Sequence, residues 1–324
     1  MQSLQFKSFG QPEEVMELVE LPLPALESGQ VQVRVLASAI NPADINYVQG
    51  YYGVKPELPS TCGIEGVAEV LDSQSELFQA GDRVIFIKRV GTWQQELICS
   101  ADSLVKVPQA LAIEQAAMLK VNPLTALQLL TSFVDLKAGD WIIQNAANSG
   151  VGQSVIQLAQ ILGIKTINIV RREEALAEIA HLGGDINLVD AEDLKSQVLA
   201  LTNAVEPQLA MNAVGGDSAL HLMDCLAPKG QHVTYGAMSL RSLKVPNKFL
   251  IFKGISLHGL WVTEWLSQTP YKQIQQTYQQ LADYVIAGKL SQPVAATYPL
   301  AEHQQALTHA QQPKRGGKIL FNCQ

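Results

Sequence analysis

Two adjacent tyrosines, Tyr51 and Tyr52, lie between glycines in the stretch QGYYG (residues 49–53). The stretch is too short for a helix and too interrupted for a strand, so we expect a loop. A phenol has a pKa of about 10, stays protonated at neutral pH and can deliver a proton to a reacting atom. One of these hydroxyls is therefore a candidate general acid, and the alternative is a pair of ordinary loop aromatics.

A second candidate site is the segment ANSGVG (147–152), which follows the apolar run DWIIQNA and precedes a helical pattern. A dinucleotide-binding turn carries G-x-G-x-x-G here, and the three positions hold Ala147, Ser149 and Gly152. Gly152 would allow close packing of helix on strand, and Gly150 would let the backbone approach a pyrophosphate. Asn148 and Ser149 could donate further hydrogen bonds. The alternative is a glycine-rich turn that binds nothing.

The end of the next predicted strand indicates which dinucleotide binds. NAD enzymes usually carry Asp or Glu about 20 residues past the glycines, where it holds the ribose hydroxyls. This chain has Arg171 and Arg172 at that point, in VRREE. A guanidinium pairs with a 2′-phosphate in bidentate fashion, whereas a carboxylate would repel it. The sequence predicts NADPH, and the alternative is that the arginines pair with Glu173 and Glu174.

The secondary-structure elements that would position these residues follow two sequence patterns. Up to about residue 120 the chain has short runs that alternate at the strand period, at 31–40, 66–71 and 82–87, separated by turn residues. From there strands and helices alternate, which indicates a parallel sheet covered on both faces. Six such strands, the last at 255–261, predict a doubly wound dinucleotide fold.

The last segment has the pattern of the first part of the chain again, with an extended run at 291–300, a helical run and a final strand, KRGGKILF. We expect it to pack onto the N-terminal domain. The predicted domains are a catalytic domain over 1–120, a Rossmann domain over 121–265 and a returning segment over 266–324 that completes the first. The expected fold class is α/β, with the Rossmann domain inserted in a β-rich domain.

Composition limits the partners. The chain has 324 residues, is 47% hydrophobic, and carries a formal charge of -7 without a block of like charge. Nothing in this pattern indicates a nucleic-acid or anionic-membrane surface. No apolar run approaches the roughly 20 residues of a membrane span. The four cysteines are far apart, which favours a reduced compartment, and we expect a cytoplasmic protein.

Together these features resemble the medium-chain dehydrogenase/reductase superfamily, whose members join a β-rich GroES-like domain to an inserted Rossmann domain. Zinc-dependent members carry a Cys early in the first domain and a Gly-His-Glu motif later. The matching positions here are Asn41 and Ile64, and neither supplies the thiolate or imidazole that zinc needs. Glu65 is retained. The resemblance therefore implies a zinc-free member.

Within the zinc-free members, several segments resemble the mitochondrial-type 2-enoyl thioester reductases. They are INPADINYVQGYYGVKPELPSTCGIEGVAEV, NAANSGVGQSVIQLA, MNAVGG, VTYGAMS and FKGISLHGLWVTEWL. The resemblance implies NADPH-dependent reduction of trans-2-enoyl-CoA or acyl-carrier-protein esters, with a small-molecule substrate. The quinone oxidoreductase branch is the nearest alternative, and a non-enzymatic NADPH-binding sensor or structural protein is another. Relatives pair through the edge of the Rossmann sheet, which implies a homodimer.

The resemblance also implies roles for individual residues. Tyr52 matches the proton donor, and Asn41, Tyr51 and Trp261 match the substrate pocket. The cofactor would be held by Asn122, Asn148, Ser149, Gly150, Val151, Gly152, Arg171, Arg172, Tyr235, Gly236, Ala237, Met238, Leu260, Trp261, Val262 and Lys318. Hydride addition at the β-carbon leaves an enolate-like charge, and Tyr52 would protonate the α-carbon. No residue of the sequence identifies the group that stabilises this charge.

Overall fold

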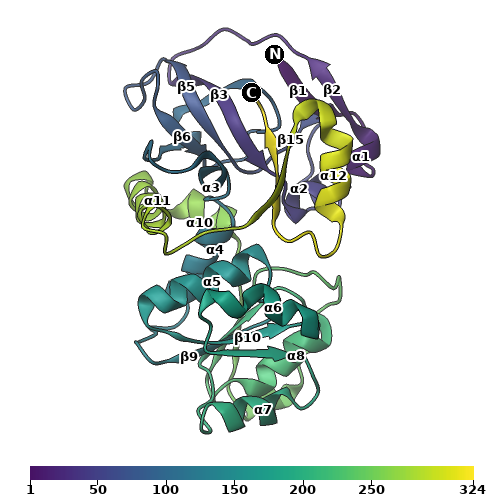
Figure 1. Cartoon of the computed structure of the whole chain (residues 1–324), viewed down its shortest axis with the longest axis vertical. Helices are drawn as coiled ribbons and strands as arrows, with labels where there is room; N and C mark the ends of the chain where they lie inside the picture. Colours follow the sequence, from purple (N-terminus) through teal and green to yellow (C-terminus); the bar gives the residue numbers. More distant parts are fainter. The chain divides into compact units, whose positions relative to one another are not determined.

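The computed structural model describes residues 1–324, which divide into two compact units (Figure 1). The first unit comprises Met1–Val121 and Thr263–Gln324, and the second comprises Asn122–Val262. The first unit is therefore built from two stretches of chain that the second separates. No helix is both long enough and apolar enough to cross a membrane.

A seven-stranded sheet forms the centre of the first unit. Its strand order is β15-β16-β3-β5-β6-β8, and β7 also pairs with β3. The strands are β3 (Gln30–Ala39), β5 (Gly66–Ser73), β6 (Arg83–Phe86), β7 (Glu96–Ser100), β8 (Leu104–Lys106), β15 (Val294–Pro299) and β16 (Lys318–Asn322). The antiparallel pairing of β16 with β3 places Leu320 opposite Ala39, so the last strand joins the sheet that begins near residue 30.

A second, three-stranded sheet and several helices complete this unit. The sheet has the order β2-β1-β4, with β1 (Gln2–Phe6), β2 (Met16–Glu20) and β4 (Ser60–Thr61). The helices are α1 (Pro12–Val15), α2 (Pro42–Val48), α3 (Ile113–Ala117), α10 (Val262–Gln268), α11 (Tyr271–Ile286) and α12 (His303–Gln311). The period-2 pattern of β3 buries Val31, Val33 and Val35 completely, as expected for a strand with one face on a core.

The second unit is a six-stranded parallel sheet with the order β11-β10-β9-β12-β13-β14. Its strands are β9 (Trp141–Gln144), β10 (Lys165–Val170), β11 (Ile186–Val189), β12 (Leu209–Asn212), β13 (Gln231–Thr234) and β14 (Ser256–Gly259). In chain order this is 3-2-1-4-5-6, the doubly wound arrangement, so the predicted fold class is confirmed. Ligands of such sheets bind where the order reverses, here beyond the carboxyl ends of β9 and β12.

Helices cover both faces of this sheet (Figure 1). They are α4 (Asn122–Thr131), α5 (Gly150–Leu162), α6 (Leu176–Ile179), α7 (Leu194–Leu201), α8 (Gly216–Cys225) and α9 (Asn247–Ile251). Helix α5 ends at Gly163, whose φ of +71° fits a glycine stop. The apolar spacing of the next run, EALAEIAHLGG, predicts a single helix, but the structure divides this run: α6 is one short helix between 3-10 turns at 173–175 and 180–182. The segment buries only Ala175 and Ile179, too few contacts to hold a longer helix.

Candidate active site

The start of α2 places two polar side chains inside the first unit. Asn41 is extended, with φ -109° and ψ 155°, and caps the helix, while Pro42 takes the first helical position. The backbone N–H of Asn41 donates to Asp44 Oδ2 at 3.0 Å. Asn41 and Asp44 are both buried. The Asn-Pro turn is therefore a helix cap, and it also carries these side chains into the interior.

Asn41 belongs to a buried network with Glu65 and Lys318. Its Nδ2 donates to Glu65 Oε1 at 2.8 Å, and the N–H of Val121 donates to Glu65 Oε2 at 2.9 Å. Lys318 Nζ donates to Asn41 Oδ1 and lies 3.8 Å from Glu65 Oε1. Burial lowers the pKa of Lys318, and Glu65 opposes that shift. A buried ammonium thus faces a buried carboxyl group, and Asn41, one of the two positions that match zinc ligands, is bonded to both.

The residues at these positions do not fit a zinc ion. The Asn41 amide is bonded to Glu65 and Lys318, and Ile64 offers only its carbonyl, which accepts from Lys120 Nζ at 2.7 Å. Zinc takes thiolate, imidazole and carboxylate ligands. No group of three or more His, Cys, Asp or Glu side chains in the structure could hold a metal ion.

Lys120 gives this network a pH dependence. Burial lowers the pKa of its ammonium from 10.5 to about 7, although Glu65 raises it. Between pH 7 and pH 10.5 the folded chain holds fewer protons on Lys120 than the unfolded chain. The contribution of Lys120 to the free energy of unfolding therefore increases with pH in this range. We expect the unfolding free energy of wild type, relative to Lys120→Met, to increase from pH 7 to pH 10. Urea titrations of both proteins measure the difference, and a pH-independent difference would contradict the assignment.

The loop that follows α2 holds its two tyrosines differently. The N–H groups of Tyr51 and Tyr52 both donate to the carbonyl of Asn46, at 2.9 and 3.0 Å. The Tyr51 side chain is 83% exposed. Tyr52 packs against the core of the unit, and its ring meets the ring of Tyr47 edge-on at 6.5 Å. Of the two tyrosine rings, only that of Tyr52 is therefore held in place by neighbouring side chains.

Arg89 lies beside both rings, and sequence reasoning missed it. Its guanidinium carbon is 4.3 Å from the ring centroid of Tyr47 and 5.0 Å from that of Tyr52. Nη1 lies 3.7 Å from Oδ1 of the fully buried Asp44. Burial raises the pKa of Asp44, and Arg89 opposes the shift. Cys62 Sγ is 3.7 Å from the same carboxyl oxygen. No local pattern around Arg89 could have predicted these contacts.

The turn before α5 has the geometry of a phosphate site. Ser149 caps the helix, and its Oγ accepts the N–H of Gly152 at 3.1 Å. The N–H groups of Gly150 and Val151 have no partner in the structure, so two donors of the first turn remain available. A Cβ at Gly152 would lie 2.6 Å from Ala147 Cα, so only glycine allows this close approach of helix and strand. These residues fit a pyrophosphate.

The residues after β12 and β13 border the same end of the sheet. The Tyr235 hydroxyl is buried, burial raises the pKa of its phenol, and the Ser149 hydroxyl opposes this shift. Sequence reasoning missed Asn145 and Asn212. Asn145 Nδ2 donates to Asn212 Oδ1 at 2.9 Å, and the N–H of Ala213 donates to Asn145 Oδ1 at 2.8 Å. These amides fix the carboxyl ends of β9 and β12, where the strand order reverses.

Arg171 and Arg172 begin the loop after β10. Arg171 is exposed and Arg172 half-buried. The ion pairs of this unit join other residues: Lys137–Asp135, Lys195–Glu206, His221–Asp190, Arg241–Asp217, Lys248–Asp224 and Lys253–Glu206. The pairing of these arginines with Glu173 and Glu174 is absent from the structure. Both guanidinium groups are free to meet an anion.

The other predicted cofactor residues lie in the second unit, with the exception of Lys318. Asn122 is buried at the start of α4. Gly236, Ala237 and Met238 follow β13, and Met238 is exposed. Leu260, Trp261 and Val262 follow β14, and Trp261 is 47% exposed. Lys318 is buried in the first unit, where its ammonium meets Asn41 and Glu65.

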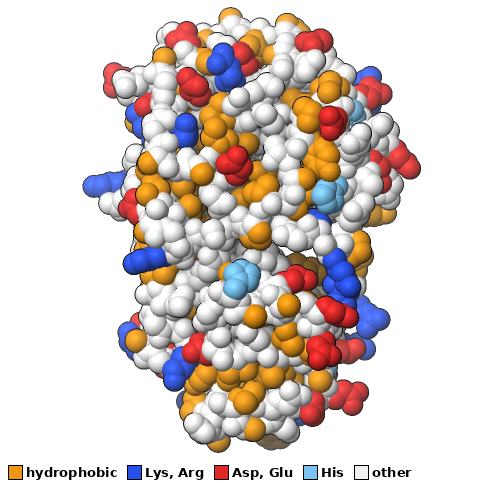
Figure 2. Space-filling model, in the orientation of Figure 1, with side chains coloured by type: hydrophobic (Ala, Val, Ile, Leu, Met, Phe, Trp, Pro, Cys, Tyr) orange, Lys and Arg blue, Asp and Glu red, His pale blue; other side chains and the backbone are white.

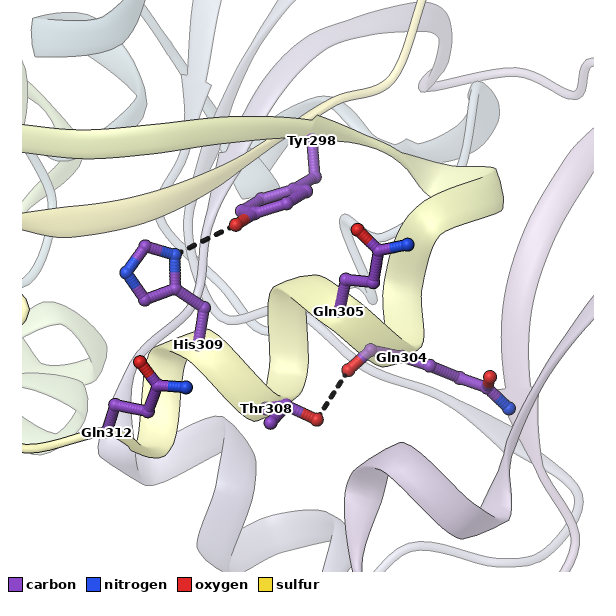
Figure 3. A pocket seen from close by; sticks show the side chains of 6 residues that line it. All are labelled: Tyr298, Gln304, Gln305, Thr308, His309 and Gln312. Atoms are coloured by element: carbon purple, nitrogen blue, oxygen red, sulfur yellow. Dashed lines mark hydrogen bonds between the residues drawn. The ribbon is translucent and has the colours of Figure 1, made fainter.

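A shallow pocket of about 460 Å³ lies elsewhere in the first unit, between β15 and α12 (Figure 3). It is lined by Tyr298, Gln304, Gln305, Thr308, His309 and Gln312. Tyr298 Oη and His309 Nδ1 are 2.9 Å apart, and Thr308 Oγ1 donates to the carbonyl of Gln304 at 2.8 Å. None of the predicted site residues lines this pocket.

Two family models match the chain. The Alcohol dehydrogenase GroES-like domain matches residues 27–109, and the Zinc-binding dehydrogenase model matches residues 150–285. The mitochondrial enoyl-[acyl-carrier-protein] reductase of Xenopus tropicalis is 40% identical over 321 residues, which cover 96% of this chain and 92% of that protein. The family match thus extends over both units.

Three solved structures are similar over 99% of this chain. A complex of Etr1p with NADP and crotonyl-CoA has a TM-score of 0.88 at 29% identity, covering 99% of that chain. The Etr1p/Etr2p heterodimer of mitochondrial 2-enoyl thioester reductase from Candida tropicalis has a TM-score of 0.87 at 29% identity and 99% coverage. A quinone oxidoreductase of Pseudomonas syringae has a TM-score of 0.86 at 27% identity and 99% coverage. The chain therefore belongs to the medium-chain dehydrogenase/reductase superfamily and, within it, to the family of the enoyl-[acyl-carrier-protein] reductases.

Proposed function

We propose that the protein is an NADPH-dependent reductase that saturates the C=C bond of trans-2-enoyl thioesters. The observation that carries this proposal is the 40% identity to an enoyl-[acyl-carrier-protein] reductase over 96% of the chain. The related Etr1p structure contains NADP and crotonyl-CoA, which supports both the cofactor and the substrate class. The free donors of Gly150 and Val151 and the unpaired arginines of the second unit support binding of a phosphorylated dinucleotide.

The residues divide the work as follows. The turn at Ser149–Gly152 holds the pyrophosphate, and Arg171 and Arg172 hold the 2′-phosphate. Asn122, Tyr235–Met238, Leu260–Val262 and Lys318 complete the cofactor contacts, and Asn41, Tyr51 and Trp261 line the substrate pocket. NADPH supplies the hydride that reduces the β-carbon. Tyr52 delivers a proton to the α-carbon and recovers one from solvent.

A substrate panel tests this proposal. We expect NADPH oxidation with crotonyl-CoA and with a longer 2-enoyl-CoA. The similarity to the Pseudomonas syringae quinone oxidoreductase makes reduction of quinones or small enones the second candidate. Turnover of quinones with no turnover of any enoyl thioester would favour that candidate. Tight NADPH binding without turnover of any electrophile would favour a non-enzymatic role.

Cofactor choice rests on the two arginines. We expect Arg171→Ala and Arg172→Ala to weaken NADPH binding by about tenfold or more each, because a charge-assisted bond to phosphate contributes roughly 1.5–3 kcal/mol. Binding of NADH should stay unchanged, since NADH has no 2′-phosphate. Fluorescence titrations with both cofactors measure this, with Lys165→Ala, in the strand that precedes the two arginines, as a control. Equal wild-type affinities for NADPH and NADH would refute the argument.

We also propose that the protein forms a homodimer through the edge strand β14. Ile251 and Phe252, at the end of α9 and a few residues before this strand, are 69% and 86% exposed, as expected for side chains that a partner covers. The Etr1p/Etr2p heterodimer supports pairing in this family. Light scattering of the purified chain measures the oligomeric mass, and a monomer at micromolar concentration would contradict the proposal.

We propose a cytoplasmic location on the basis of the cysteines. All four are buried and unpaired, and such thiols persist in a reducing compartment. Fluorescence microscopy of a tagged chain, compared with a mitochondrial marker, tests the location.

The surface charge bears on the kind of partner. Positive and negative side chains are interspersed on the face shown in Figure 2, which supports a small-molecule substrate rather than a nucleic acid or a charged membrane.

A further inference from the structure

We propose that Arg89 is a positioning residue for Tyr52: the stacked guanidinium holds the phenol ring in the direction from which it protonates the substrate. This inference rests on the proposed function, because it concerns the same proton transfer. Arg89 belongs neither to the sequence motifs described above nor to the phosphate turn, so this role is new for it.

The contacts of Arg89 are with ring faces rather than with hydrogen-bond acceptors. Its guanidinium carbon lies 5.0 Å from the Tyr52 centroid and 4.3 Å from the Tyr47 centroid. These separations are in the range of cation–π contacts. Tyr47 and Tyr52 also meet edge-on, with ring planes at 74°. The three side chains therefore form one packed group, in which the cation limits the tilt of both rings.

Asp44 also anchors the cation. Its carboxyl group is completely buried and is fixed by the backbone N–H of Asn41. Arg89 Nη1 is 3.7 Å from Asp44 Oδ1, an ion pair too long for a hydrogen bond. Since α2 carries Asp44 and Tyr47 and is capped by Asn41, one short helix sets the position of the guanidinium relative to the Tyr52 loop.

The unused donors of Arg89 indicate that stability alone does not account for this arrangement. Nη1 and Nη2 are both inaccessible and have no hydrogen-bond partner. A buried donor without a partner costs free energy, and a group of this kind in a folded protein calls for an explanation. The adjacent Lys88 has ordinary surroundings, because it is exposed and pairs with Asp102. Lys88 is therefore a matched control for loss of a positive charge.

The experiment follows the configuration of the product in D₂O. Hydride from NADPH adds to the β-carbon of crotonyl-CoA, and deuterium from the Tyr52 hydroxyl adds to the α-carbon, which oxidises the cofactor and gives butyryl-CoA with one α-deuterium. We expect wild type and Lys88→Met to give one α-configuration. Arg89→Met should give both configurations and a kcat lowered by about tenfold to a hundredfold, less than the roughly 10²- to 10⁴-fold loss expected when the general acid itself is removed. Arg89→Lys should lie between them.

Two further measurements keep the result interpretable if Arg89→Met is unstable. Guanidinium ion at millimolar concentration should partly restore kcat and configuration in Arg89→Ala, which a merely structural role would not produce. The inference would be overturned if Arg89→Met gave a single α-configuration at the wild-type kcat. It would also be overturned if Arg89→Lys folded and had a lower kcat but gave a product of unchanged α-configuration. If wild type reduces no enoyl thioester, the proposed function fails first, and that outcome is distinct from either of these.

Discussion

Tyr52→Phe is expected to lower kcat for enoyl thioester reduction by roughly 10²- to 10⁴-fold, the contribution of a positioned general acid. The substitution removes the hydroxyl but keeps the ring that contacts Tyr47 and Arg89. Binding of NADPH should therefore stay close to wild type. Steady-state rates with crotonyl-CoA at saturating NADPH measure the loss.

Tyr51→Phe is the matched control for this prediction. Tyr51 is the neighbouring residue, its side chain is 83% exposed, and its loss of a hydroxyl should leave kcat close to wild type. A large loss in Tyr51→Phe with an active Tyr52→Phe would show that the proton donor lies one position earlier. Quinone reduction offers a second comparison, because it needs no protonation of a defined carbon and should tolerate Tyr52→Phe.

Lys318→Met is expected to destabilise the fold by about 3–5 kcal/mol, the usual cost of removing one partner of a buried ion pair. Lys318 is 7% exposed and Glu65 completely buried, so the remaining carboxyl group would lose its cation without gaining water. Asn41 would also lose the bond to its Oδ1. Urea unfolding of the wild type and the variant measures the change in free energy.

Two controls separate the causes of this loss. Adding Glu65→Gln to Lys318→Met removes the unpaired charge and should recover part of the stability, as a double-mutant cycle would show. Lys7→Ala breaks the exposed pair with Glu17 and should cost at most about 1 kcal/mol. NADPH titration of folded Lys318→Met tests the predicted cofactor role: unchanged affinity would contradict it. A Lys318→Met protein as stable as wild type would contradict the buried pair.

The sheet order could be predicted because its determinants are local and repeated. Period-2 runs and strand–helix alternation identified β3 and the six strands of the second unit, and the apolar run KTINIV (165–170) forms β10. Glycine signals were equally informative, since Gly163 ends α5 and Gly152 packs against Ala147. The prediction of one continuous α-helix over 173–182 was wrong. The apolar spacing of this segment fits a helix, but its packing contacts stabilise only the single turn of α6.

The buried polar groups could not be predicted, because their partners are distant in sequence. Asn41 and Lys318 are separated by 277 positions, and Asn145 and Asn212 by 67. No periodicity links such residues. Arg89 stands beside Lys88, and the two have the same charge, yet the half-buried Arg89 lies over aromatic rings and the exposed Lys88 pairs with Asp102. Only the folded chain distinguishes them.

The pairing of β16 with β3 has a consequence for how the protein is made. β3 ends at Ala39, but its partner strand starts at Lys318, so the first unit stays incomplete until residues 318–322 have left the ribosome. At about 5–20 residues per second, translation of the intervening segment takes on the order of ten seconds or more. The inserted unit, Asn122–Val262, is continuous and can fold in that interval. Nascent chains that end before residue 318 would therefore expose the edge of β3 to chaperones.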